Sequence, residues 1–342
     1  MLRLHLPDQP TPALSPEAIA AGPDALTPLP PAEAIQRAVW VDLAFPLRLE
    51  VEAVETALGI ELPAKADMMA IEASSRVYHE DGAHVMNLLL VVGVDSGTPS
   101  SEPVSLVLTD SRLITVRYSD PRAFRTLDAS CIKGAPGPSA QALLVRLLEA
   151  AVDRTADILE RMGDEIDSTS QLVFGLDRPA GARISNTDLQ QILRSIGAIQ
   201  LTLNKVHDSL VTLLKTTSFL QTGPGSEDGA RSRWDKLLKE RVKSISRDVM
   251  SLAENANFLT QNVGFLLDAA LGRISIEQNA IVKIFSVAAV IFLPPTLVAS
   301  IYGMNFQFMP ELGFRFGYPM AIGLMILSAV VPYLWFKRKG WL

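Results

Sequence analysis

Hydrophobic and polar positions alternate as in β-strands over the first 135 or so residues and follow a helical period afterwards. Short apolar runs bounded by turn residues predict strands at residues 3–6, 38–43, 75–80, 85–94, 104–109 and 112–118. Residues 46–59 have one apolar face with helical spacing and end at a glycine, which predicts a helix. The expected fold is an α/β domain, a mixed sheet with flanking helices.

The chain changes character after a Gly- and Pro-rich linker at residues 134–138. Residues 140–174 are helical in pattern and acidic, and residues 185–220 predict a second helix. From Arg231 to Leu293 there is no proline, and helical periodicity holds throughout. One helix of about 60 residues would be about 90 Å long at 1.5 Å per residue. That length indicates a coiled-coil or membrane-entering element rather than an ordinary globular helix.

Two stretches near the end are apolar enough to cross a bilayer, residues 284–301 and 318–336. Each is close to the roughly 20 residues that a spanning helix needs. The predicted organisation follows from these spans and the linker. It comprises an N-terminal cytoplasmic α/β domain (1–138), a cytoplasmic helical region with a long stalk helix (139–282), a first span (283–305), an outer loop (306–317), a second span (318–336) and a basic tail (337–342).

Charge sets the expected orientation of the two spans. The run Lys337-Arg338-Lys339 follows the second span directly, and the positive-inside rule places it in the cytoplasm. The N-terminus has no long apolar segment typical of a signal peptide, so it is expected on the same side. We therefore expect both termini in the cytoplasm.

One face of the first span suits a pore. Its residues recur at alternating steps of three and four, and we call them the candidate pore face: Asn279, Val282, Ser286, Ala289, Leu293, Thr296 and Ser300. Small and hydroxyl residues on one face favour either a water-filled pore or tight helix packing, and spacing does not decide between them. Val282 and Leu293 are candidate hydrophobic constrictions. Because a hairpin of two helices cannot enclose a pore, transport requires an oligomer.

The end of this span carries neutral oxygen atoms. Gly303 and Asn305 offer backbone and side-chain carbonyl groups with no net charge. Mg²⁺ prefers six oxygen ligands and gives up its waters reluctantly, so a ring of such carbonyls could hold the hydrated ion through its waters. The simpler interpretation is that Gly and Asn only end a helix, as they often do.

Composition narrows the function classes. The chain has 342 residues, a net charge of −6 and 48% hydrophobic residues, which gives no reason to expect nucleic acid as a partner. A single cysteine excludes an internal disulfide and a cysteine-based zinc site within one chain. We find no catalytic or cofactor-binding motif in a convincing context, so we expect neither an enzyme nor a cofactor. His79 and His84 flank a likely turn and could meet, although a metal site there is the less favoured interpretation.

The residues after the first span resemble a known family. Tyr302-Gly303-Met304-Asn305, followed by Met309-Pro310-Glu311-Leu312, resembles the signature of the CorA magnesium/cobalt transporters. The sequence around this motif resembles the family as well, at Glu277-Gln278-Asn279, at residues 292–300 and at the last residues, 336–342. The match is dense from about Asp268 onward and looks most like the enterobacterial type.

The resemblance implies a funnel-shaped homopentamer in the bacterial inner membrane. In that family the long helix lines the pore, and Gly303, Met304 and Asn305 would form the selectivity filter, with Asn305 binding Mg²⁺ through its hydration shell. The resemblance also implies that Co²⁺ and Ni²⁺ can pass through the pore. Lys337, Arg338 and Lys339 would form a basic collar at the cytoplasmic exit.

Two positions depart from the family pattern. The outer loop often carries a carboxylate where Gln307 stands, which leaves Glu311 as its only acid. The stretch Arg241–Asp248 is basic where family members carry regulatory acids, so no gating ligands are transferred there.

An acidic face lies on a predicted helix further upstream, where Asp153, Asp157 and Glu160 are spaced along one side. It is either a Mg²⁺-sensing surface or a solvated helix face.

Two other functions compete with Mg²⁺ transport. A zinc transporter of the same superfamily shares the Gly-Met-Asn motif, although Met309–Leu312 favours the magnesium branch. A membrane-tethered helical scaffold would carry no ion and would tolerate Asn305→Ala.

Overall fold

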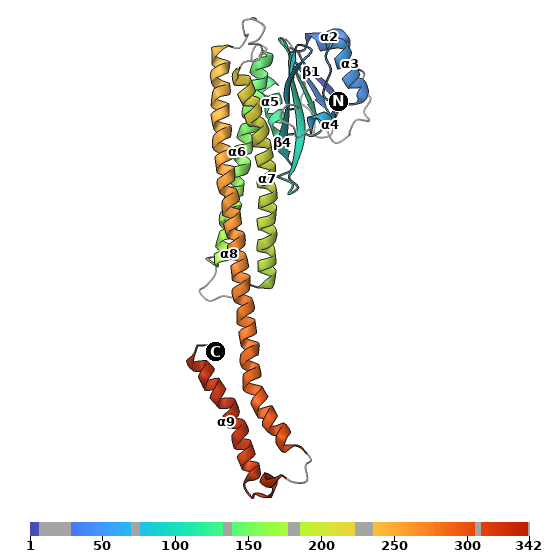
Figure 1. The fold of residues 1–342 in the computed structure, drawn as a ribbon. Helices are drawn as coiled ribbons and strands as arrows, with labels where there is room; N and C mark the ends of the chain where they lie inside the picture. The colour runs from blue at the N-terminus through green and yellow to red at the C-terminus, as the bar shows by residue number, and fades with distance from the viewer. Residues whose placement is uncertain are drawn as a thin grey trace. The chain divides into compact units, whose positions relative to one another are not determined.

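The computed structural model describes residues 1–6, 29–69, 76–132, 139–176, 185–222, 235–304 and 309–340 (Figure 1). They form two compact units, Met1–Leu266 and Leu267–Leu342, and the division falls within helix α8 (Lys236–Tyr302). The linker predicted at residues 134–138 lies outside the described residues. The expected domain boundaries therefore stay predictions.

The first unit is built on a six-stranded mixed sheet in the order β1-β2-β6-β5-β4-β3. Its strands are β1 (Leu2–His5), β2 (Trp40–Ala44), β3 (Val77–Glu80), β4 (Ala83–Val92), β5 (Ser100–Leu108) and β6 (Leu113–Arg117). Only β2 and β6 pair in parallel, and the other neighbours are antiparallel. All the strands expected from the apolar pattern are present, and the mixed sheet is confirmed.

Helices cover both faces of this sheet (Figure 1). One face carries α2 (Ala32–Arg37), α3 (Arg48–Leu58) and α4 (Lys65–Met68), and the other carries α5 (Arg122–Ile132), α6 (Ala140–Phe174) and α7 (Asn186–Thr222). The predicted helices correspond to α3, α6 and α7. The helices α2, α4 and α5 were not expected. The six residues of α2 and the four of α4 are too few to establish a period, whereas α5 packs against α6.

A buried ion pair links the two parallel strands at the centre of the sheet. Asp42 on β2 accepts from Arg117 on β6, with Nη2 to Oδ2 at 2.9 Å, and from the Thr115 hydroxyl at 2.8 Å. Burial alone would raise the pKa of Asp42, but the charge and hydrogen bonds of Arg117 hold it below its usual value of 3.8. The carboxylate is therefore ionised at neutral pH. Its stabilisation is lost only as the pH falls below 3.8, through the lowered pKa.

Helix α8 packs within the first unit through an apolar stripe. Its buried residues there recur at helical spacing: Val242, Ile245, Val249, Ala256, Leu259, Val263 and Leu266. An amphipathic face of this kind stabilises a helix by packing rather than by propensity. The single long helix predicted from the lack of proline is confirmed, and it also continues through Pro294 and Pro295 to Tyr302.

The second unit contains the end of α8, the short 3₁₀ helix η2 (Pro310–Gly313) and α9 (Gly317–Arg338). Both predicted spans are helical, and both are long and apolar enough to cross a membrane. Only 6% and 11% of their most apolar stretches are buried. A core helix of a soluble protein would be mostly buried, so this exposure supports two membrane spans.

Asp42→Ala should destabilise the protein strongly, because it leaves the Arg117 guanidinium buried without its carboxylate. Breaking such a pair typically costs about 3–5 kcal/mol. The matched control is Arg48→Ala, which removes an ion pair with Glu52 whose arginine is 91% exposed. Exposed pairs contribute about 0.5 kcal/mol. Thermal unfolding of the full chain in detergent, followed by circular dichroism, should show a large fall in midpoint for Asp42→Ala alone. Equal midpoints would show that the pair does not support the sheet.

Candidate functional site

The candidate pore face lies on one side of α8 and has no partner in the described chain. All seven of its residues are exposed, including the apolar Val282 and Leu293 at 61% and 65%. Nine residues of an α-helix make 2.5 turns, so Thr296 and Val287 point to opposite sides of α8. Val287 is only 3% exposed. Val287 is therefore packed on the side opposite the candidate pore face, whereas other apolar residues of the span, such as Phe285 and Phe292, are exposed.

The end of α8 and α9 form a hairpin of two helices (Figure 1). Ala321 and Phe336 of α9 are buried, as is Val287 of α8. The Lys283 amine also donates to the Gly340 carbonyl at 3.4 Å, which brings the start of one span to the end of the other. Val287 is packed here, whereas Ile284 on the same side of α8 is 55% exposed, so packing covers only part of that side.

Two hydroxyl groups on the candidate pore face are oriented as acceptors. Ser286 donates its hydroxyl hydrogen to the Val282 carbonyl at 2.8 Å, and Thr296 donates to the Phe292 carbonyl at 2.8 Å. A hydroxyl has one hydrogen and two lone pairs. Because the hydrogen is used within the helix, each oxygen presents lone pairs to its surroundings.

The proposed filter begins where α8 ends. The Gly303 amide donates to the Ala299 carbonyl at 3.0 Å, and the Met304 amide donates to the Ile301 carbonyl at 3.3 Å. A Cβ atom at Gly303 would lie 3.1 Å from the Ala299 oxygen, closer than most such contacts. A glycine therefore suits this tight helix end.

Two residues of the predicted outer site cannot be placed. Asn305 lies outside the described residues, and so does Gln307. Glu311 lies in η2, but its side chain is outside the described part. The arrangement of the filter at Asn305 therefore stays a prediction.

The basic residues of the predicted collar are Lys337 and Arg338 in the last turn of α9 and Lys339 just after it. All three are exposed, and the Lys339 amine lies 4.5 Å from the centre of the Trp335 ring. The contact between Lys283 and Gly340 adds a further positive charge at this end of the hairpin. Sequence reasoning missed Lys283, although a lysine bordering an apolar span is the signal that the positive-inside rule uses.

The acidic face is exposed along α6, with Asp153, Asp157 and Glu160 all on the surface. Burial raises the pKa of Asp153, and the negative charges of Glu149, Asp157 and Asp248 raise it further. An aspartate of α8 thus adds to the negative charge beside α6. In the described part of the chain, no three His, Cys, Asp or Glu side chains converge closely enough to hold a metal ion. The acidic face is therefore an extended surface within one chain.

One arginine of the basic stretch Arg241–Asp248 forms an ion pair with an acid of α6. Arg241 on α8 donates through Nε to Glu149 of α6 at 2.8 Å. Hydrogen bonding to that carboxylate raises the pKa of Arg241. This ion pair joins α6 and α8 within the first unit and accounts for one base where the family pattern has acids.

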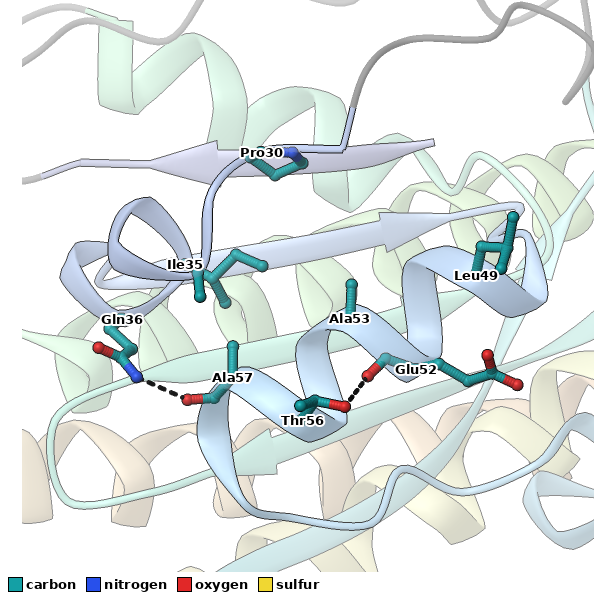
Figure 2. Close-up of a pocket in the computed structure, with 9 residues that line it drawn as sticks. Pro30, Ile35, Gln36, Leu49, Glu52, Ala53, Thr56 and Ala57 are labelled. Carbon is teal, nitrogen blue, oxygen red and sulfur yellow. Dashed lines mark hydrogen bonds between the residues drawn. The ribbon is translucent and has the colours of Figure 1, made fainter.

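A recess of about 470 Å³ lies between α2 and α3 in the first unit (Figure 2). Its side-chain donors are already used, since Gln36 donates to the Ala57 carbonyl at 3.0 Å and Thr56 donates to the Glu52 carbonyl at 2.7 Å. A ligand site needs polar groups that converge on the ligand to orient it. The recess lacks them, so the candidate site remains the end of α8 and its pore face.

Comparisons with known proteins show the family to which the chain belongs. Residues 36–338 match the family described as CorA-like Mg²⁺ transporter protein. The magnesium transport protein CorA of Pasteurella multocida is 38% identical over 310 residues, which cover 90% of this chain and 93% of that protein. The corresponding protein of Yersinia pseudotuberculosis is 37% identical over 312 residues, covering 89% and 92%. The resemblance found in the sequence is confirmed, including its enterobacterial side.

A solved structure shows the same fold. The complete CorA magnesium transporter from Methanocaldococcus jannaschii aligns with a TM-score of 0.70 over 90% of this chain and 92% of that one, at 18% identity. The expected fold class, an α/β domain followed by long helices and two candidate spans, is confirmed.

Proposed function

The chain belongs to the family of CorA-like Mg²⁺ transporter proteins, and from that premise we propose that it is one subunit of a membrane channel for Mg²⁺. The observation that carries this proposal is the candidate pore face, whose seven residues are all exposed along the span of α8. Small and hydroxyl side chains there suit a water-filled passage.

The pore forms between copies of the chain, since two helices cannot surround a channel. By resemblance to the family the assembly is a funnel-shaped homopentamer in the bacterial inner membrane, with both termini in the cytoplasm. Symmetry then repeats each residue of the candidate pore face around the axis. Val282 and Leu293 become apolar rings that can close the passage to water and ions by dewetting.

Hydrated Mg²⁺ presents the hydrogen atoms of its water shell, so the channel must offer acceptors. Asn305 supplies a side-chain carbonyl and Gly303 a backbone carbonyl at the outer end. Ser286 and Thr296 supply hydroxyl lone pairs further along, because their hydrogens are bonded within the helix. Neutral acceptors hold the hydrated ion without trapping it, whereas carboxylates would release it slowly.

The membrane potential drives entry without ATP. A divalent ion crossing 100 mV gains about 4.6 kcal/mol, at about 2.3 kcal/mol per charge. That energy supports about three decades of accumulation. Co²⁺ and Ni²⁺, as hydrated divalent ions, pass by the same route. Lys337, Arg338 and Lys339 surround the exit with positive charge.

Asn305→Ala should abolish selective Mg²⁺ entry. Each subunit loses one acceptor for the hydrated ion, and a hydrogen bond to a charged partner contributes about 1.5 kcal/mol or more. We therefore expect at least a tenfold loss, since about 1.4 kcal/mol is a factor of ten. The measurement is potential-driven uptake into liposomes that carry the purified protein and a Mg²⁺-sensitive dye.

Three outcomes of this experiment separate the proposed functions. Mg²⁺ entry that disappears in the variant supports the channel with its filter at Asn305. Zn²⁺ flux helped by a proton gradient, without Mg²⁺ flux, would replace the channel by a zinc transporter. No flux of any ion from the wild type would indicate a scaffold.

Cysteine substitution tests which side of α8 meets water. In a background with Cys131 replaced by serine, Ser286→Cys and Thr296→Cys should react rapidly with a charged, water-soluble thiol reagent. Ile284→Cys and Ile291→Cys serve as controls on the other side of the same helix and should react slowly. The rates are measured by mass spectrometry on protein in liposomes. Similar reaction rates at all four positions would show that this face of α8 does not line a water-filled pore.

Neutralising the acidic face tests whether it senses Mg²⁺. The triple variant Asp153→Asn, Asp157→Asn and Glu160→Gln should raise the internal Mg²⁺ concentration needed to inhibit uptake by about fivefold or more. Three exposed charges at about 0.3 kcal/mol each amount to about 1 kcal/mol. The control replaces three other exposed acids, Glu33, Glu52 and Glu61, by Gln. Unchanged inhibition in the triple variant would leave the face as a solvated surface.

A further inference from the structure

Two histidines meet across the hairpin of β3 and β4. His79 and His84 are direct cross-strand partners in the antiparallel register. Their Nδ1 atoms lie 3.2 Å apart, whereas the ring centres are 4.5 Å apart, so the nitrogen edges converge. His79 is exposed on the edge strand β3, and the pair is open to solvent. Without another ligand the two nitrogens share one proton as donor and acceptor.

We propose that His79 and His84 form a two-imidazole site for a divalent first-row transition cation such as Zn²⁺ or Co²⁺. Zinc binds imidazole nitrogen at about 2.0–2.1 Å. Two nitrogens 3.2 Å apart, each at that distance from one ion, subtend an angle of about 103°. This is near the tetrahedral angle, so the existing separation fits the metal with little movement. The cation replaces the proton that otherwise lies between the rings.

The ligand type selects the class of cation. Imidazole suits zinc, copper, cobalt and nickel, whereas Mg²⁺ prefers hard oxygen ligands. No third His, Cys, Asp or Glu converges on the pair within the described ranges, so water fills the other positions. The site is therefore open and exchangeable, unlike a structural zinc site with four protein ligands.

The surroundings hold one ring of the pair in place. The Phe219 ring on α7 packs edge-to-face with the His84 ring, with the ring centres 5.6 Å apart. Burial and the neighbouring His79 lower the pKa of His84, and Asp110 opposes this shift. A neutral imidazole is the form that binds metal. One ligand is thus oriented before the cation arrives, and this arrangement does not depend on transport.

Calorimetric titration of the full-length, tag-free protein in detergent with Zn²⁺ tests the site. Excess Mg²⁺ is present throughout, so that oxygen-ligand sites are occupied. We expect one Zn²⁺ per chain in the wild type and at least a tenfold weaker affinity in His79→Gln and in His84→Gln, since even the loss of a supporting group at a metal site costs about tenfold. His207→Gln, an exposed histidine on α7, is the matched control and should bind as the wild type does.

A second readout is thermal stability. Zn²⁺ should raise the unfolding midpoint of the wild type and of His207→Gln, because a ligand that binds the folded state stabilises it. It should not raise the midpoint of His79→Gln, whose replaced side chain is exposed on an edge strand and is not needed for folding. Zn²⁺ binding by His79→Gln that equals the wild type, or no binding by the wild type, would overturn the proposal.

Discussion

A backbone inside a bilayer has no water to bond to, and this constraint shapes the Leu267–Leu342 unit. Helices α8 and α9 satisfy it by bonding within themselves. Pro294 and Pro295 are the exceptions in α8, because proline has no N–H to donate to the carbonyl four residues earlier. The carbonyls of Val290 and Ile291 therefore lose their helical donors. Such groups are tolerated in a span only where a side chain, another helix or water reaches them. Ile291 lies on the side of α8 opposite the candidate pore face, so a neighbouring helix or side chain, and not the passage itself, has to meet that condition.

The same helix carries two different stripes along its 67 residues. Between Val242 and Leu266 the stripe is apolar and buried, as packing within a soluble domain requires. From Asn279 to Ser300 the stripe is small and partly hydroxyl, and it is exposed. Both stripes follow the helical period, in steps of three and four apart from one step of seven between Val249 and Ala256, so the spacing is the same and only the side chains differ. The choice of side chain decides whether a stripe is filled by another helix or left facing water.

The sequence predicted those features that depend on neighbours along the chain. The strands, the long helices and the two spans follow from local periodicity, and all of them are found. The ion pair of Asp42 with Arg117 could not be predicted, because it joins parallel strands 75 residues apart and only the fold brings them together. Helix α5 was missed for a related reason, since its register is set by packing on α6. The meeting of His79 and His84 could be foreseen, because a tight turn links their strands.

The candidate pore and the histidine pair differ in how much of a site one chain contains. A hydrated ion needs acceptors arranged around an axis, so each chain supplies only one side of that ring. The residues involved, such as Ser286 and Thr296, are ordinary in one subunit and become a site only by repetition. Family motifs therefore point to the pore more directly than the geometry of one chain does. His79 and His84 instead converge within a single hairpin, and their nitrogens select a different class of cation from the oxygens of the pore face. Under the two proposals, the chain would separate hard and borderline metal ions by ligand type.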